Sequence, residues 1–328
     1  MPVTVQTVEY RSSKPGDEER IIPFLRECGY SPDDRSWNWI NRRCPHGETL
    51  VELGLMEGRI VGHYSVLPRP LDVRGVRVSS GLAIHAAVHP QFRGLALLQG
   101  LMGRIVERCR ENRTRFIYAF PNDQIWLVYQ KLFHWQSLGN LDVLELSLAD
   151  WTDRERAPSG ISVQDPVFFD ERYEDFLRSL GSQGAQISVL KDRSYLNWRY
   201  ADHPKVSYRL LEARGNGTEI LGFLILKRYE KLGKHYGHLV EFGVRPENTP
   251  VGVRLVRQAL AELSHPPVDV VSCWISQHDP LYPVLRQMGF DVGNSQAPVG
   301  YRWVDPVRPP ETFELKDWQI RMGDSDAF

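Results

Sequence analysis

The sequence predicts a duplicated α/β fold, with two similar domains that follow one another along a chain of 328 residues. Three observations support this prediction. The same order of apolar strands and amphipathic helices occurs twice, matched segments recur at a nearly constant spacing, and a polar linker divides the two copies. The length also suits two domains of about 150 residues each.

The first copy runs from an extended segment through a hairpin to a long amphipathic helix. In that long helix, apolar residues recur at steps of three and four, which is the spacing of one buried helix face. The expected elements are, in order, a strand at 3–8, a helix at 17–25, hairpin strands at 50–55 and 59–64, a strand ending at Val88, a helix at 95–111, a strand at 115–120 and a short helix opened by Asp123.

The second copy repeats this order with matching landmarks. Val88-His-Pro and Val244-Arg-Pro lie 156 positions apart, and Asp123 and Asp279 keep the same spacing. Spacing this constant over several elements indicates duplication. The expected elements are a strand at 161–164, a helix at 170–177, hairpin strands at 208–213 and 219–224 around an Asn-Gly turn, a helix at 251–263, a strand at 268–274 and a short helix opened by Asp279.

The domain boundaries follow from composition. The stretch Ala149-Asp-Trp-Thr-Asp-Arg-Glu-Arg-Ala-Pro-Ser-Gly160 is polar and rich in helix breakers, as linkers are. We therefore expect an N-terminal domain at 1–148, a linker at 149–160, a C-terminal domain at 161–305 and a tail at 306–328. Within the tail we expect a strand at 311–322 and packing of Trp318 into a cleft.

Composition limits the class of protein and its partners. Hydrophobic residues make up 42% and charged residues 25%, the balance of an ordinary globular protein. The net charge of -1 provides no general attraction to nucleic acid or to an anionic membrane, and no apolar run is long enough to span a bilayer. The N-terminal segment lacks the pattern of a secretory signal, so we expect a cytoplasmic protein. The four cysteines lack the spacing of a metal site, so we expect no metal.

One segment has the pattern of an anion site. Gln91-Phe-Arg-Gly94-Leu-Ala96 lies between the strand that ends at Val88 and the long helix. The first backbone N–H groups of a helix have no partner within it, and the helix dipole is positive there. Gly94 lets the backbone approach a phosphate closely, Ala96 keeps the first turn uncrowded, and Arg93 adds a full charge.

This segment resembles the pyrophosphate loop of the GNAT superfamily of N-acetyltransferases, in which Val-x-Pro and Gln/Arg-x-x-Gly-x-Gly/Ala precede a helix. The resemblance covers roughly 3–147 and, more loosely, 161–304. It implies a tandem duplication of the mixed-sheet GNAT acyltransferase fold, and it implies that acetyl-CoA, or another acyl-CoA, binds to the first copy. The cofactor-binding residues that it implies are Val88, Gln91, Phe92, Arg93, Gly94, Leu95, Ala96 and Asn122.

The resemblance also implies a reaction. A primary amine would attack the thioester of acyl-CoA directly, and a backbone N–H near Val88 would hold the oxyanion. Tyr129 stands where the family has the tyrosine that protonates the CoA thiolate. A phenol keeps its proton at neutral pH and donates it as charge develops on sulfur. Phe133-His134 stand where the family has Gly-Phe, which alters the end of the helix that carries Tyr129.

The base that accepts the proton of the amine is chosen from three residues. His85 lies on the strand that leads to the loop, and its reference pKa is near neutral. Glu52 and His63, on the preceding strands, are rivals. We take His85 as the candidate base, and the sequence leaves the choice open.

The second copy lacks the residues of the loop. At the 156-residue spacing it has Glu247, Pro250 and Leu285 in place of the glutamine, the glycine and the tyrosine. A proline has no N–H for a phosphate, a glutamate repels it, and a leucine cannot donate a proton. We therefore expect a degenerate second copy that serves structure or substrate binding.

The expected function is an acyl-CoA-dependent N-acyltransferase, most simply an N-acetyltransferase, that acts on a small-molecule amine. Overall likeness to tandem GNAT proteins of surface-polysaccharide synthesis suggests an amino sugar as the acceptor. Two alternatives stay open: an aminoacyl or long-chain acyl transferase of the same fold, and a non-catalytic CoA-binding scaffold or sensor. The sequence also leaves assembly as a homodimer open.

Overall fold

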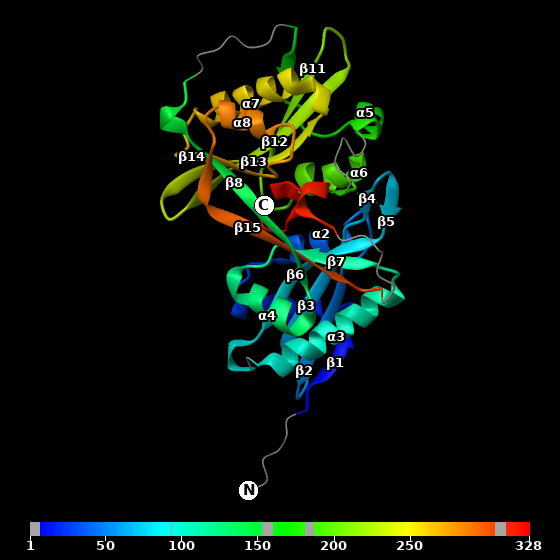
Figure 1. Ribbon diagram of the computed structural model, residues 1–328. Coiled ribbons are helices and arrows are strands. Elements are labelled where there is room, and N and C mark those ends of the chain that lie inside the picture. The colour runs from blue at the N-terminus through cyan, green and yellow to red at the C-terminus, as the bar shows by residue number, and fades with distance from the viewer. Residues whose placement is uncertain (1–6, 93, 153–159, 181–186, 306–312) are drawn as a thin grey trace. The chain divides into compact units, whose positions relative to one another are not determined.

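The computed structural model describes residues 7–92, 94–152, 160–180, 187–305 and 313–328 (Figure 1). The chain divides into two compact units, and each unit takes segments from both halves of the sequence. Unit 1 comprises Met1–Pro70, Val78–Leu138 and Val299–Thr312, and unit 2 comprises Leu71–Arg77, Gly139–Pro298 and Phe313–Phe328. The domains expected from the sequence are continuous stretches. The two units differ from them because each unit also contains residues from the other half of the sequence.

Unit 1 is a mixed sheet with helices on both faces. Its strands lie in the order β1-β2-β3-β6-β7-β15, and the pairings are antiparallel except between β6 and β7, which are parallel. Its elements are β1 (Glu9–Ser12), α1 (Glu18–Glu27), α2 (Asp34–Arg42), β2 (Leu50–Met56), β3 (Arg59–Pro68), β6 (Ser80–Val88), η1 (Pro90–Phe92), α3 (Leu95–Glu111), β7 (Phe116–Ala119), α4 (Asp123–Phe133) and the end of β15 (Asp291–Trp303).

Two apolar clusters cover the two faces of this sheet. α3 packs over β2 and β3, where a Cβ added to Gly62 would come within 2.7 Å of Leu101. α1 and Trp37 of α2 pack on the other face, against Val51, Leu53 and Leu55 of β2. The alternation follows from the period of two in a strand, whose successive side chains point to opposite faces.

Unit 2 has a similar plan. Its large sheet has the order β8-β14-β13-β12-β11-β9, and β13 and β14 are its parallel pair. A small sheet has the order β16-β10-β4-β5. The elements are β4 (Leu71–Val73), β5 (Val76–Val78), β8 (Gln136–Ser147), η2 (Leu148–Asp150), β9 (Ser162–Gln164), α5 (Arg172–Leu180), β10 (Ile187–Val189), α6 (Arg193–Leu196), η3 (Asn197–Ala201), β11 (Arg209–Arg214), β12 (Ile220–Lys231), β13 (Lys234–Val244), η4 (Pro246–Asn248), α7 (Thr249–Leu263), β14 (Val270–Ile275), α8 (Tyr282–Gln287), η5 (Leu315–Asp317), β16 (Trp318–Gln319) and η6 (Met322–Asp324).

Each unit completes its large sheet with a strand from the other half of the sequence. In unit 1, Gly300–Trp303 of β15 pair antiparallel with Phe116–Ala119 of β7. In unit 2, Asp142–Ser147 of β8 pair antiparallel with Val270–Ile275 of β14. Without these partners β7 and β14 would each present a row of unpaired backbone groups at a sheet edge. Closing those two edges is the physical reason why the units are discontinuous in sequence.

The structure confirms the duplicated α/β fold, including both hairpins and both long helices. The expected short helix after β7 begins one residue earlier than predicted. Its N-cap is Asn122, whose Oδ1 accepts a hydrogen bond from the N–H of Ile125 at 3.1 Å, and not Asp123. The cap of α8 is Leu281, and Asp279 lies in the turn before it.

Of the strand expected at 3–8, residues 3–6 lie outside the described part of the chain, and the first described strand is Glu9–Ser12. The strand expected at 311–322 is reduced to Trp318–Gln319, flanked by two 3-10 turns. Trp318 is buried, as expected. None of the described helices combines the length and the apolar character that crossing a bilayer requires.

Candidate functional site

The candidate site lies in unit 1, where the parallel strands β6 and β7 end and the helices α3 and α4 begin. Adjacent parallel strands bring their carboxyl ends, and so the starts of the following helices, to one edge of the sheet. Among the described residues, β6 pairs with β7 only from Ser80 to Leu82. β6 continues to Val88, so its second half diverges from β7.

Gly94 is the residue from which α3 begins. Its backbone is extended, with φ of -173° and ψ of 152°, a conformation that any residue adopts. A Cβ added to Gly94 would meet no described atom within 4 Å beyond its chain neighbours. The first N–H groups of this 17-residue helix have no partner within the helix, and the positive end of the helix dipole lies at this turn. Such a helix end is suited to bind an anion.

The structure gathers most of the predicted cofactor residues at this edge. Arg93 and the side chain of Leu95 lie outside the described residues. Gln91 and Ala96 are exposed, and Phe92 is half-buried. The fully described positions are Val88 at the end of β6, Gln91 and Phe92 in η1, Gly94 at the N-cap of α3, Ala96 in its first turn, and Asn122 at the N-cap of α4.

A β-bulge shapes the diverging part of β6. Two residues of β6, His85 and Ala86, face the single residue Tyr64 of β3. His85 has a left-handed backbone with φ of 49°. Its half-buried ring packs edge-on against Tyr30, with ring centroids 5.2 Å apart. Bulges of this kind bend a strand and re-aim its groups beside active sites.

Residues 9–131 match the family model of the acetyltransferase (GNAT) domain. These residues form a GNAT domain. The matched stretch contains the diverging strands, the turn at Gly94 and α4 as far as Lys131. No curated protein matches the sequence closely enough to count as a relative.

Solved structures share the fold over nearly the whole chain. The GCN5-related N-acetyltransferase of Anabaena variabilis ATCC 29413 has a TM-score of 0.70 at 14% identity, over 91% of this chain and 73% of that one. A tandem GNAT protein from the clavulanic acid biosynthesis pathway has a TM-score of 0.67 at 16% identity, over 92% and 100%. The N-myristoyltransferase of Saccharomyces cerevisiae with bound myristoyl-CoA has a TM-score of 0.61 at 14% identity, over 94% and 85%. At such identities the likeness establishes a tandem GNAT fold.

Tyr129 of the GNAT domain lies on α4 with 3% of its surface exposed. Its hydroxyl is 2.8 Å from the hydroxyl of Tyr64, and its ring stacks on Trp135 with centroids 4.7 Å apart. Burial raises the pKa of Tyr64 well above its usual value, so that phenol keeps its proton. Because Tyr64 faces the bulge from β3, this hydroxyl pair connects α4 to the strand beside the diverging part of β6. The sequence did not indicate Tyr64, since its link to Tyr129 spans 65 positions.

The end of α4 differs from the register that the 156-residue spacing predicts. His134 is left-handed after α4, with φ of 55°, as Gly289 is after α8, with φ of 95°. Leu285 lies four positions before Gly289, and the residue four positions before His134 is Gln130. Leu285 therefore corresponds to Gln130, which is exposed, and not to Tyr129. The helix ends one residue later than the spacing predicts, and this register turns Tyr129 toward the core.

The three base candidates have different surroundings. His63 is fully buried on the face that α1 and α2 cover, and burial lowers its pKa to about 3. A group with such a pKa is a poor proton acceptor at neutral pH. Glu52 lies on the opposite face, where Ser12 donates a hydrogen bond to it at 2.5 Å and burial raises its pKa. Of the three, only His85 is partly exposed.

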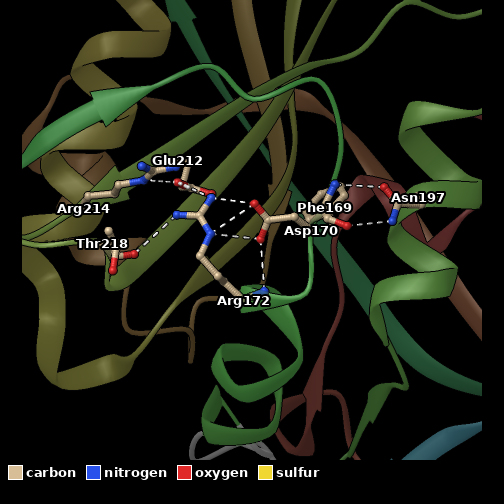
Figure 2. Close-up of polar contacts among 7 residues, drawn as sticks. All are labelled: Phe169, Asp170, Arg172, Asn197, Glu212, Arg214 and Thr218. Atoms are coloured by element: carbon tan, nitrogen blue, oxygen red, sulfur yellow. Dashed lines mark hydrogen bonds and ion pairs between the residues drawn. The ribbon is translucent and has the colours of Figure 1, made fainter.

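Unit 2 also buries a glutamate on its corresponding strand, β11. Figure 2 shows Arg172 between Asp170 and Glu212, with Arg214 on the other side of Glu212. Arg172 Nη2 lies 2.6 Å from Asp170 and 3.8 Å from Glu212, and Arg214 Nε donates to Glu212. These ion pairs tie the segment before α5 to the sheet. In unit 1, Glu52 on β2 likewise has polar partners, since Ser12 donates a hydrogen bond to it and Arg104 Nε lies 3.8 Å from it.

The C-terminal segment of the chain, drawn in red in Figure 1, occupies the corresponding place in unit 2. β13 pairs with β14 only from Tyr236 to His238, so these strands diverge as β6 and β7 do. Arg321 is buried there, forms an ion pair with Asp279 beyond β14, and lies 5.6 Å over the ring of Phe242 of β13.

A buried ion-pair cluster holds this segment against β13. Lys191 Nζ lies 2.7 Å from Glu241 of β13 and 2.8 Å from Asp324. A Cβ added to Gly323 would come within 2.0 Å of the hydroxyl of Tyr200. The same Cβ would lie 3.1 Å from Oε2 of Glu241, so Gly323 packs closely against η3 and against Glu241 of β13.

Proposed function

We propose that this protein is an N-acyltransferase that moves an acyl group from acyl-CoA, in the first instance acetyl-CoA, to a small primary amine. The observation that carries the proposal is the turn at Gly94, where a glycine with open space around it begins a long helix beside a diverging strand. The match of residues 9–131 to the GNAT domain supports the class of reaction. Amino sugars are the first acceptors to screen.

Each predicted residue then has a role in one edge of unit 1. The turn from Val88 to Ala96 binds the pyrophosphate, with Arg93 as the added charge, and Asn122 lies at the start of the second helix on this edge. A backbone N–H of β6 holds the thioester oxygen as it gains negative charge. Within this turn, Gln91, Phe92, Gly94 and Leu95 contact the cofactor through their backbone or their side chains.

Two side chains move protons in this scheme. His85 accepts a proton from the amine, so that the nitrogen attacks the thioester carbon. As the C–N bond forms and the C–S bond breaks, Tyr129 donates a proton to the leaving sulfur. The hydroxyl of Tyr64, 2.8 Å from that of Tyr129, holds the Tyr129 hydroxyl in place for this donation.

The proposal includes one acyl-CoA site per chain, in unit 1. The matching helix of unit 2, α7, begins Thr249-Pro250, and Pro250 has no N–H to offer. The place between its diverging strands holds Arg321 and Asp324 of the same chain. Unit 2 is then a structural partner or a contributor to acceptor binding.

Calorimetric titration of acetyl-CoA into the full chain tests the cofactor site. The variant is Gly94→Ala, because alanine adopts the extended backbone of Gly94 without strain and its Cβ meets no described atom. Any weakening therefore reports on the ligand. We expect one site in the wild type and at least tenfold weaker binding in the variant, since the methyl group keeps a phosphate from the helix N–H groups. Gly103→Ala, in the same helix and equally open, is the matched control.

The reaction is tested separately by release of the CoA thiol with a panel of amines that includes amino sugars. Tyr129→Phe should lower kcat on the order of 100-fold, since general acid catalysis contributes that much. Two sites per chain, or a Gly94→Ala variant that binds like the wild type, would contradict the cofactor site. Thiol release unchanged in Tyr129→Phe would remove Tyr129 from the mechanism.

A further inference from the structure

Three side chains donate hydrogen bonds to three successive carbonyl groups of β6, at its bulge. A buried carbonyl that has no hydrogen-bond partner destabilises the folded state by about as much as the loss of a hydrogen bond. These donors act where β6 has diverged from β7 and its regular pairing is interrupted. The bonds are Ser65 Oγ to Ile84 O at 2.9 Å, His63 Nδ1 to His85 O at 2.8 Å and Tyr30 OH to Ala86 O at 3.2 Å.

The chemistry of His63 fits a fixed donor. A carbonyl oxygen only accepts, so Nδ1 must carry the hydrogen and Nε2 is left as an acceptor. Among the described residues, that buried Nε2 has no hydrogen-bond partner. Burial lowers the pKa of His63 to about 3, so the ring stays neutral at any working pH. Burying this histidine leaves Nε2 without a hydrogen bond. The hydrogen bond that the side chain does make is the one from Nδ1 to the carbonyl of His85.

Fixing these carbonyls also fixes amide groups. A peptide unit is planar and trans, so the N–H of each residue points opposite to the carbonyl of the residue before it. Ser65 and His63 lie on β3, so they draw the carbonyls of Ile84 and His85 toward that strand. The N–H of His85 therefore points away from β3, and the N–H of Ala86 points away from the ring of His63.

We propose that Ser65, His63 and Tyr30 form a carbonyl clamp that aims the amide groups of the β6 bulge at the thioester oxygen of the acyl donor. The three are positioning residues, since they act through the backbone of β6. The inference deepens the proposed function and rests on it, because the oxyanion is the group that these amides would stabilise. Two preorganised N–H donors in a bulge serve this purpose better than one in a regular strand, where neighbouring amides point to opposite edges.

The test uses His63→Leu and His63→Asn in the full chain. Leucine removes the donor, whereas the amide N–H of asparagine replaces Nδ1–H. We expect His63→Leu to lower kcat on the order of 100-fold with little change in KM for acetyl-CoA, because misplaced donors cost transition-state stabilisation and not ground-state binding. His63→Asn should restore most of the rate. Equal loss in both variants, or no loss in either, would overturn the proposal.

Amide hydrogen exchange provides a readout that does not need turnover. The peptide over 84–88 should exchange faster in His63→Leu than in His63→Asn or the wild type, while the peptide over α3 stays unchanged. Unchanged exchange at 84–88 would overturn the clamp itself. If the wild type acetylates no amine, the proposed function fails, and the exchange data still decide the clamp.

Tyr30→Phe covers the case in which His63→Leu fails to fold. It removes one hydroxyl from a half-buried ring and leaves the core of unit 1 intact. We expect faster exchange at 84–88 and a fall in kcat of about tenfold, since one of the three bonds is lost. A Tyr30→Phe variant with wild-type exchange and rate would also count against the clamp.

Discussion

Replacing Lys191 by methionine should strongly destabilise unit 2. The Lys191 Nζ lies between Glu241 at 2.7 Å and Asp324 at 2.8 Å, and those carboxylates have side-chain exposures of 2% and 0%. Methionine keeps the length of the side chain and removes its charge. Two buried carboxylates would then face each other without the ammonium group that lies between them.

The magnitude follows from that burial. Removing one partner of a buried ion pair costs about 3 to 5 kcal/mol. Burial already raises the pKa of Glu241, so this carboxyl would take up a proton when Lys191 is lost and would limit the cost. We therefore expect a loss near the lower figure, about 3 kcal/mol, which corresponds to a fall of roughly 6–12 °C in Tm for a unit of this size.

The assay is chemical denaturation, with a matched control on the C-terminal segment that Lys191 contacts. Lys316 also lies close to a carboxylate, 2.6 Å from Glu314, but both side chains are more than half exposed. Solvent screens such a pair, so Lys316→Met should not measurably change the unfolding midpoint. A Lys191→Met variant as stable as Lys316→Met would refute the reasoning, because the segment would not then be held by a buried ion-pair cluster.

Two further predictions concern stability. Gly323→Ala should lower the free energy of unfolding by about 1–3 kcal/mol, because its Cβ would overlap the buried hydroxyl of Tyr200; Gly217→Ala, where a Cβ meets nothing within 4 Å, is the control, and equal midpoints would contradict the close contact. A hydrogen bond from Arg11 lowers the pKa of Asp17, so the stability that Asp17 adds is present above its usual pKa and lost as the pH falls through the folded value. Asp17→Asn should therefore be less stable than the wild type by about 1 kcal/mol at pH 7. In urea titrations the gap should narrow only as the pH falls below 3.8, the ordinary pKa of an aspartate, and a gap that narrows already well above that pH would argue against this linkage.

Much of the fold was predictable because its signals are local. Apolar residues at helical spacing located α3, and turn residues located both hairpins. The turn at Gly94 was predictable for the same reason, since strand, glycine and helix follow one another directly. The end of α4 was not, because the position of its left-handed residue, His134, depends on how the helix packs and not on a glycine signal.

The sequence by itself determined the order of the elements, the duplication and the loop with the chemistry of an anion site. These depend on residues within a few positions of each other, whose conformational preferences act whatever the rest of the chain does. Only the tertiary structure decided which strands complete each unit, which carbonyls of β6 the side chains of β3 hold, and what fills the place between β13 and β14. Such contacts join residues that are far apart in the sequence. Lys191 and Asp324, for example, are more than a hundred positions apart, so no local sequence pattern predicts their contact.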